Sequence, residues 1–234
     1  MPDQAGGTTD SRTRVRVRDS SFWQAYVRRR YAILFYTLLV MLIALPTATW
    51  IGLPAKGLRI LLGTCLLAAV MPNSTKKTRV ALAGSALLLM IVRYASESDE
   101  VPIPAGLMLA VVGVAGLLAA ASTLRFVVTE REVGNETIYA ALSTYLLAGV
   151  FFAQIYLGLE RLWPGSLTSP TPFTDASAVY YSFVTLATLG YGDILPKSDL
   201  ARGVAVFEVV GGQLFLAVMV ARLIGLFGSG RSDL

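Results

Sequence analysis

Long apolar stretches, separated by short polar ones, make up most of this chain. A further apolar run, Ala176–Thr188, is too short to span a membrane and predicts a helix that enters it and turns back. The pattern predicts an all-α membrane protein with six transmembrane helices and one re-entrant helix. Each of the six stretches reaches or approaches the length of about 20 mainly apolar residues that a spanning helix needs: Tyr31–Trp50, Lys56–Met71, Thr78–Tyr94, Ile103–Leu124, Thr137–Leu159 and Leu200–Phe227.

The junction between the first two stretches is ambiguous. The second stretch is short, and Pro46 and Pro54 lie close to where the two meet. Because proline interrupts helices, an alternative is that this pair forms one kinked, tight hairpin.

The distribution of charge supports six spans that start on the inner side of the membrane. Basic residues then fall on the cytoplasmic side, as the positive-inside rule expects, and the acidic loop Ser96–Glu100 falls outside. We therefore expect a multi-pass protein of the cell (plasma or inner) membrane with cytoplasmic N- and C-termini. The basic residues that this arrangement places on the cytoplasmic side are Arg12, Arg14, Arg16, Arg18, Arg28, Arg29, Arg30, Lys76, Lys77, Arg79, Arg125, Arg131, Arg222 and Arg231.

The composition agrees with a membrane protein and excludes several classes of site. Hydrophobic residues account for 55% of the chain and charged residues for 15%, against about 25% charged in soluble domains. The chain has no histidine and one cysteine, Cys65, which excludes an internal disulfide and argues against a Cys/His zinc site. We find no catalytic constellation and no phosphate-binding loop, so we expect neither an enzyme nor a cofactor. The net charge of +5 is explained by arginines beside the spans rather than by nucleic-acid binding.

The first 30 residues are expected to form a cytoplasmic tail. Within it, Ser21–Arg30 combines aromatic residues with three arginines, which is typical of an interfacial helix on the inner leaflet; the alternative is a plain linker. Anionic lipid is a candidate partner of this tail, although charge alone does not establish it.

The most informative motif is Thr188-Leu189-Gly190-Tyr191-Gly192-Asp193, between the last two predicted spans. Backbone carbonyls can ligate a dehydrated cation without a strong negative charge that would trap it. To aim successive carbonyls at one axis, the chain must leave strand geometry at alternate positions, and glycine takes positive φ at little cost. Gly190 and Gly192 fit that requirement. The alternative, an ordinary glycine-containing turn, is less consistent with two flanking spans.

With these residues, and with a preceding helix of the right length, the segment resembles the selectivity filter of the potassium channels, in which Val is commoner than Leu189. The resemblance covers about Thr137–Phe227 and implies a homotetramer, since one such loop cannot surround an ion. It implies that K⁺ permeates past oxygens of Thr188, Leu189, Gly190 and Tyr191. It also implies that Leu189 and Tyr191 pack behind the filter, and that Asp193 at the outer mouth raises the local cation concentration.

The resemblance also assigns parts to a pore domain at residues 128–228. Thr137–Leu159 is the outer helix, and Glu160–Thr174 is the extracellular turret. The pore helix follows, with Thr174 as N-cap and Asp175 as first-turn acid, and Leu200–Phe227 is the inner helix.

Aromatic residues of the pore helix have two interpretations. Tyr180 and Tyr181 occupy the positions of an aromatic cuff around the filter, or they are membrane-interface anchors. Val184, four residues before Thr188, is not an acid, so a Glu–Asp clamp behind the filter is not available to Asp193.

Two features of the inner helix leave alternatives open. Gly211 and Gly212 are candidates for a gating hinge, with Gly212 the better match to the family, or they serve close helix packing. Glu208 is an acid inside a span, which costs about 2.5–3.5 kcal/mol on insertion scales. We expect it behind the filter or near the cavity, with hydroxyl partners such as Ser182 or Thr185, and its role is either permeation or a structural hydrogen bond.

Residues 31–127 are expected to form a four-helix transmembrane domain in the position of a voltage sensor. Its fourth helix, Ile103–Leu124, contains no charged residue, and only Arg125 follows it. Voltage gating needs several charges that move in the field, so we predict that the channel is not voltage-gated. Residues 229–234 form a short cytoplasmic tail.

The function predicted from the sequence is passive, potassium-selective conduction. One rival is a potassium transporter subunit, but such proteins typically carry several filter-like loops in one chain, and here we find one. The other rival is a non-conducting regulatory membrane subunit, which a monomeric protein would favour.

Overall fold

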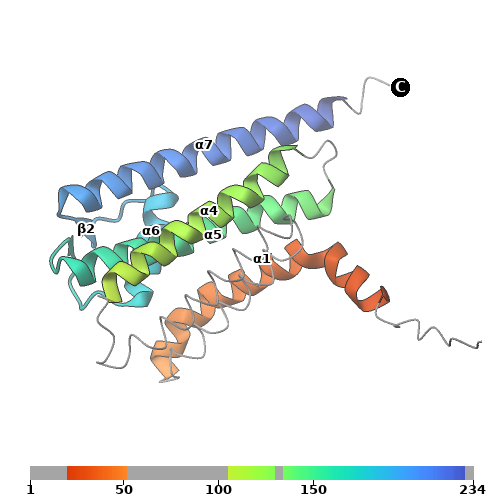
Figure 1. The fold of residues 1–234 in the computed structure, drawn as a ribbon. Coiled ribbons are helices and arrows are strands. Elements are labelled where there is room, and N and C mark those ends of the chain that lie inside the picture. Colours follow the sequence, from red (N-terminus) through yellow and green to blue (C-terminus); the bar gives the residue numbers. More distant parts are fainter. Residues whose placement is uncertain (1–19, 52–104, 130–133, 230–234) are drawn as a thin grey trace, which may run out of the picture.

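The computed structural model describes residues 20–51, 105–129 and 134–229. The elements in chain order are α1 (Ser20–Ile51), α4 (Ala105–Thr129), α5 (Asn135–Leu162), β1 (Leu167–Thr168), α6 (Asp175–Leu186), β2 (Leu195–Pro196) and α7 (Asp199–Ser229) (Figure 1). The helices account for most of this part of the chain, as predicted; residues 163–174 and 187–198 form the connecting loops and contain the short strand pair. The predicted spans Lys56–Met71 and Thr78–Tyr94 and the acidic loop between the third and fourth spans lie outside the described residues.

Two helices of the described ranges are long and apolar enough to cross a membrane. They are Asn135–Leu162, with mean hydropathy 1.6, and Asp199–Arg222, with mean hydropathy 2.1, and they correspond to the predicted outer and inner helices. Tyr31–Ala44 and Leu109–Leu118 are shorter apolar stretches within α1 and α4.

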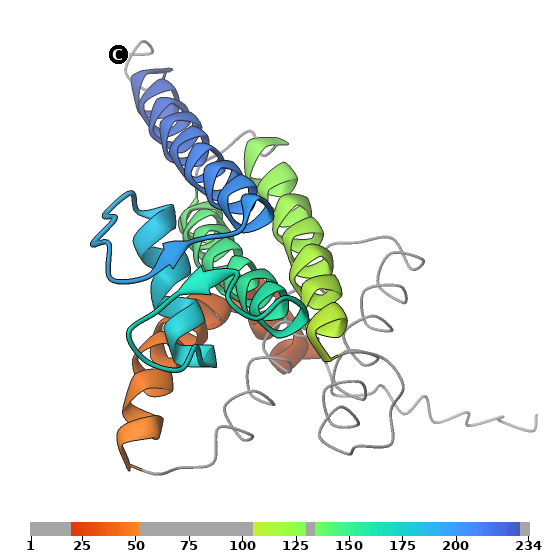
Figure 2. The same cartoon turned by 90° about the vertical axis from the view of Figure 1, so that its left-hand side faces the viewer.

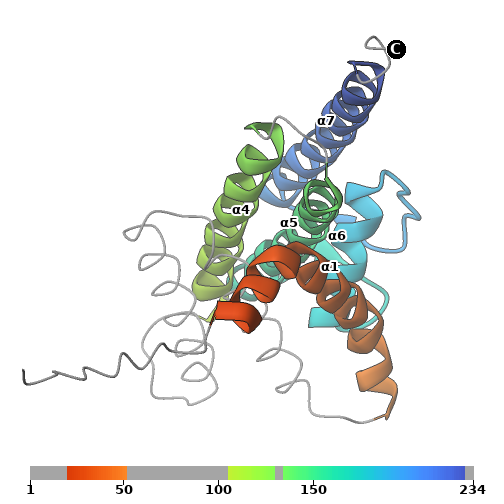
Figure 3. The ribbon, with the colours of Figure 1, turned by 90° about the vertical axis from the view of Figure 1, so that its right-hand side faces the viewer.

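Helix α5 is the centre of the described structure, because it contacts α1, α4, α6 and α7. Figures 2 and 3 show α5 between α4 on one side and α6 on the other, with α7 above and α1 crossing below. Two apolar clusters meet along α5. One joins it to α1 and α4 through Leu38, Leu109 and Phe151, and the other joins it to α6 and the start of α7 through Tyr181 and Ala201.

Glycines bring α4 unusually close to α5. A Cβ added to Gly113 would lie 2.8 Å from the carbonyl oxygen of Phe151, and one added to Gly158 would lie 2.7 Å from that of Gly106. A Cβ at Gly116 would overlap the Phe151 ring. Small residues allow such backbone approach between membrane helices. The predicted boundary between the four-helix domain and the pore domain, 127/128, lies inside α4, and α4 packs directly on the pore-domain helix that follows it.

Helix α1 is joined to the start of α5 by polar contacts as well as apolar ones. The backbone N–H of Tyr31 donates to Glu136 Oε2 at 3.3 Å, and Ser143 Oγ donates to the carbonyl oxygen of Tyr31 at 3.3 Å. The predicted interfacial segment and first span form one helix, whose N-terminal part turns away from the rest (Figure 1). Tyr31, the first residue of the predicted span, is thus fastened to α5.

Candidate functional site

Helix α6 is short because local signals start and stop it. Thr174 is its N-cap, and the Thr174 side chain accepts a hydrogen bond from the backbone N–H of Ser177 at 3.3 Å. Asp175 lies in the first turn, where a carboxylate interacts favourably with the helix dipole. Both assignments were predicted from the sequence and are confirmed. The helix ends at Leu186, and the loop of residues 187–193 follows it.

The first residues of this loop are tied back to the end of α6. The N–H of Thr188 donates to the carbonyl oxygen of Thr185 at 2.9 Å, and the N–H of Leu189 donates to that of Val184 at 2.8 Å. Thr188 has φ 58°, a left-handed conformation that costs a β-branched residue about 1–3 kcal/mol. The two hydrogen bonds hold this strained residue in place at the start of the motif.

Left-handed residues recur at every second position of the loop. Gly190 has φ 57° and Gly192 has φ 81°, so the positive φ predicted for both glycines is confirmed. Thr188 in the same region was not predicted, because propensity argues against it. An extended strand points successive carbonyls in alternate directions, and left-handed residues at alternate positions break that pattern.

Side chains of the loop are exposed in the single chain. Leu189 is 56% exposed and Tyr191 is 66% exposed, although both were expected to pack behind the loop. Tyr191 stacks on Tyr180 of α6, with ring centroids 6.4 Å apart, and the Tyr180 hydroxyl lies near the Asp193 carboxylate. Tyr180 therefore supports the loop from within the same chain, whereas Leu189 has no such cover in the single chain.

Tyr181 takes a different direction from Tyr180. It is buried, and its ring packs edge-on against Tyr156 of α5, with centroids 4.8 Å apart. Of the two residues predicted to form an aromatic cuff, only Tyr180 lies beside the loop in the single chain.

The segment after the loop is anchored to the turret. Strand β2 pairs antiparallel with β1, and the N–H groups of Lys197 and Ser198 both donate to the carbonyl oxygen of Ser166, at 2.8 and 3.1 Å. Glu160, at the end of α5, holds the turret in turn, because its carboxylate accepts from the N–H groups of Gly165 and Leu167 at 2.8 and 2.9 Å. Sequence analysis missed this support, because strands of two residues leave no periodicity.

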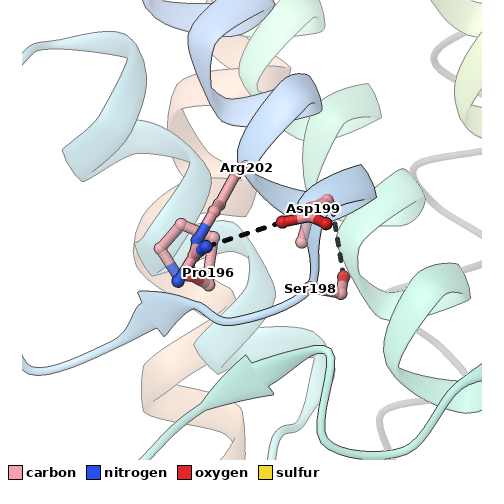
Figure 4. A network of polar contacts seen from close by, with 5 residues as sticks. Pro196, Ser198, Asp199 and Arg202 are labelled. Atoms are coloured by element: carbon pink, nitrogen blue, oxygen red, sulfur yellow. Dashed lines mark hydrogen bonds and ion pairs between the residues drawn. The ribbon is translucent and has the colours of Figure 1, made fainter.

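The start of α7 is stabilised by contacts to the same segment (Figure 4). Ser198 Oγ accepts from the N–H of Ala201 at 3.2 Å, and Arg202 Nε donates to the carbonyl oxygen of Pro196 at 3.4 Å. Arg202 also lies 3.5 Å from the carboxylate of Asp199, an exposed pair that contributes little. The backbone from the loop to α7 is thus held at both ends.

Glu208 lies inside the protein, where it joins three helices. It is fully buried; the Tyr156 hydroxyl donates to its Oε2 at 2.6 Å, and Ser182 Oγ lies 2.5 Å from its Oε1. Ser182 was predicted as a partner. The side-chain hydrogen bonds of Glu208 join it to Ser182 and Tyr156 rather than to Thr185, the other expected partner. Tyr156 was missed because an aromatic residue in an apolar helix gave no signal.

Gly212 packs against Leu186 of α6, whereas Gly211 has open space around it. A Cβ added to Gly212 would lie 2.8 Å from Leu186 Cδ1 and 2.9 Å from the Leu186 carbonyl oxygen, whereas one added to Gly211 meets nothing within 4 Å. Helix α7 runs through both residues without a break. The structure therefore gives Gly212 a packing role, and a hinge at either glycine stays a prediction.

Comparison with known proteins agrees with this part of the chain. Residues 140–228 match the ion channel family. The chain is 36% identical over 87 residues to the inward rectifier potassium channel Kirbac3.1 of Paramagnetospirillum magnetotacticum, covering 36% of this chain and 27% of that protein. It is 35% identical over 85 residues to two pore potassium channel c of Oryza sativa subsp. japonica, covering 36% of this chain and 17% of that protein. No solved structure matches the chain.

These matches confirm the resemblance inferred from the motif. They span about a quarter and about a sixth of the two relatives' lengths. The matched segment, residues 140–228, includes the whole loop and most of α5 and α7; it is similar to the ion channel family and to two potassium channels.

Proposed function

We propose that the chain is the subunit of a potassium-selective channel that conducts K⁺ passively across a membrane, with Thr188–Asp193 as its selectivity filter. The observation that carries the proposal is the left-handed backbone at Thr188, Gly190 and Gly192, in a loop between two apolar helices. This alternation suits a row of carbonyl oxygens directed to one side, which can replace the hydration shell of K⁺. K⁺ is then the permeant ion, and no cofactor is needed.

The hydrogen bonds around the loop support this role. The contacts of Thr188 and Leu189 hold its inner end on α6, and the stacking of Tyr180 on Tyr191 supports its outer end. A filter has to keep its oxygens in place when an ion leaves, and supports at both ends provide that.

We propose a homotetramer, as the resemblance to potassium channels implies, since a single loop can supply only part of a ring of ligands. Burial supports it, because 61% of the apolar stretch of α5 is buried inside the chain but only 17% of that of α7. We propose that further copies of the chain and the water-filled pore cover α7. Its apolar residues that are half or more exposed are Leu200, Val206, Phe207, Val210, Leu214, Val220 and Ile224.

We further propose that the channel is not voltage-gated. Helix α4 contains no charged residue before Arg125, and its glycines lock it against α5 of the same chain. A helix with neither gating charge nor freedom to slide is poorly suited to sense voltage. We also propose that both termini are cytoplasmic and that the loop faces the outer side, because the arginine-rich segments then follow the positive-inside rule.

Potassium flux into liposomes that contain the purified protein tests the proposal, with sodium for comparison and barium as blocker. We expect flux that is selective for K⁺, blocked by barium and carried by a tetramer. Gly190→Ala should abolish selectivity, since a side chain is strained at φ 57°, whereas the matched control Gly203→Ala lies in a helix with open space and should conduct normally. A monomeric protein without flux would instead support a regulatory or transporter subunit.

A further inference from the structure

The hydrogen bonds around Glu208 bear on its protonation state. Ser182 Oγ lies 2.7 Å from the carbonyl oxygen of Gly149 and 2.5 Å from Glu208 Oε1. A serine hydroxyl has a single proton to donate, and an ionised carboxylate only accepts. If Glu208 were ionised, one of these two short contacts would bring two oxygens together with no hydrogen between them.

A proton on Glu208 Oε1 removes the conflict. Glu208 then donates to Ser182 Oγ, and Ser182 donates to the Gly149 carbonyl oxygen. The Tyr156 hydroxyl donates to Glu208 Oε2 at 2.6 Å. Each of the three contacts then contains one hydrogen, and each hydroxyl has an acceptor.

The surroundings of Glu208 also favour a neutral acid. In the described part of the chain, the groups hydrogen-bonded to its carboxyl are the hydroxyls of Ser182 and Tyr156. The other titratable groups that face it are Tyr145 of α5 and Tyr181 of α6. These neighbours are neutral hydroxyl groups, and a buried carboxylate that lacks a cationic partner is expensive to keep ionised.

Glu208 also belongs to a contact that repeats one helical turn later. Glu208 of α7 meets Ser182 of α6, and Gly212 of α7 packs on Leu186 of α6. Both pairs advance by one turn, so α7 contacts α6 along two successive turns. The second contact lies at the end of α6, to which the backbone N–H groups of Thr188 and Leu189 are hydrogen-bonded.

We propose that Glu208 is a protonated, neutral carboxylic acid that positions α6 on α7 and thereby sets the place of the 188–193 loop. It is a positioning residue, since it touches neither the loop nor the permeation path proposed above. The effect on ion flux rests on the proposed channel function, whereas the protonation state does not.

Infrared difference spectroscopy at neutral pH tests the protonation directly, with wild-type protein against Glu208→Gln. We expect a protonated-acid carbonyl band in the wild type that shifts in D₂O and is missing from the variant. A difference spectrum that contains only carboxylate bands would overturn the proposal. A band that is present in protein without flux would leave the protonated acid intact and refute the channel function separately.

Flux measurements on the same variants test the positioning role. Glutamine reproduces the neutral acid, because its amide N–H can donate to Ser182 and its oxygen can accept from Tyr156. Glu208→Gln should therefore keep flux and K⁺/Na⁺ selectivity within about twofold, and Glu208→Ala should lose about tenfold or more, because it leaves buried hydroxyls without partners. Ser182→Ala, which removes one link and leaves the acid in place, should weaken selectivity less than Glu208→Ala. Loss of selectivity in Glu208→Gln as large as in Glu208→Ala would show that the charge is needed and would overturn the proposal.

Discussion

Replacing Gly212 by alanine tests how α7 docks on the end of α6. The added Cβ would lie 2.8 Å from Leu186 Cδ1 and 2.9 Å from the Leu186 carbonyl oxygen. The side-chain contact can relax by rotation, but the carbonyl contact requires the backbone of α6 or α7 to shift. Overpacking of this kind costs about 1–3 kcal/mol.

The same substitution also stabilises the helix by raising its intrinsic helix propensity. This gain has to be separated from the steric cost. Replacing glycine by alanine inside a helix raises the stability of the helix by about 1 kcal/mol. Gly211→Ala is the matched control, because it makes the same change in the same turn, where the new Cβ meets nothing within 4 Å. The difference in unfolding free energy between the two variants therefore isolates the steric cost, about 1–3 kcal/mol in favour of Gly211→Ala.

Titration of the purified protein with SDS, followed by circular dichroism, measures both unfolding free energies. Flux in liposomes measures the consequence, and we expect Gly212→Ala to reduce K⁺/Na⁺ selectivity because Leu186 leads into Thr188. Equal stability of the two variants would refute the packing argument. Equal stability with a large, shared change in open probability would favour a hinge at the glycine pair.

Three other substitutions give direct checks. Thr188→Gly should relieve the left-handed strain and raise the unfolding free energy by about 1 kcal/mol, yet lower K⁺/Na⁺ selectivity because it removes a hydroxyl; lower stability would contradict the strain. Glu160→Ala should lower the midpoint of thermal unfolding, since two N–H groups lose a charged acceptor worth about 1.5–3 kcal/mol for each hydrogen bond, with Glu160→Gln intermediate; an unchanged midpoint would show that the turret needs no such support. Gly116→Val should destabilise the protein by about 1–3 kcal/mol or more, because its Cβ overlaps the Phe151 ring; a neutral result in the SDS titration would show that α4 is not held there.

The parts of this structure that could be predicted from the sequence are those with local signals. Apolar length identifies α5 and α7, and Thr174 and Asp175 mark the start of α6. The positive φ of Gly190 and Gly192 could be predicted because glycine alone takes it at little cost. Thr188 could not, since its conformation depends on two hydrogen bonds to α6 that oppose its own propensity.

The contacts that sequence analysis missed join residues far apart in the chain. Tyr156 and Glu208 are 52 positions apart, and the sequence shows that Glu208 needs a partner but not which helix supplies it. The number of available hydrogen-bond protons likewise becomes visible only when Ser182 is seen to reach both Gly149 and Glu208.

The packing of helix α4 limits the part that it can play in gating. Its sequence, without charge before Arg125, already argues against voltage sensing, but an uncharged helix could still move and transmit another stimulus. The close approach at Gly106, Gly113 and Gly116 removes that freedom, because sliding α4 along α5 would move Cβ-bearing residues into places where the structure has room only for glycine. Among the described helices, a stimulus that opens the proposed pore would therefore act on α5, α6 or α7 directly, or would move α4 and α5 as one unit.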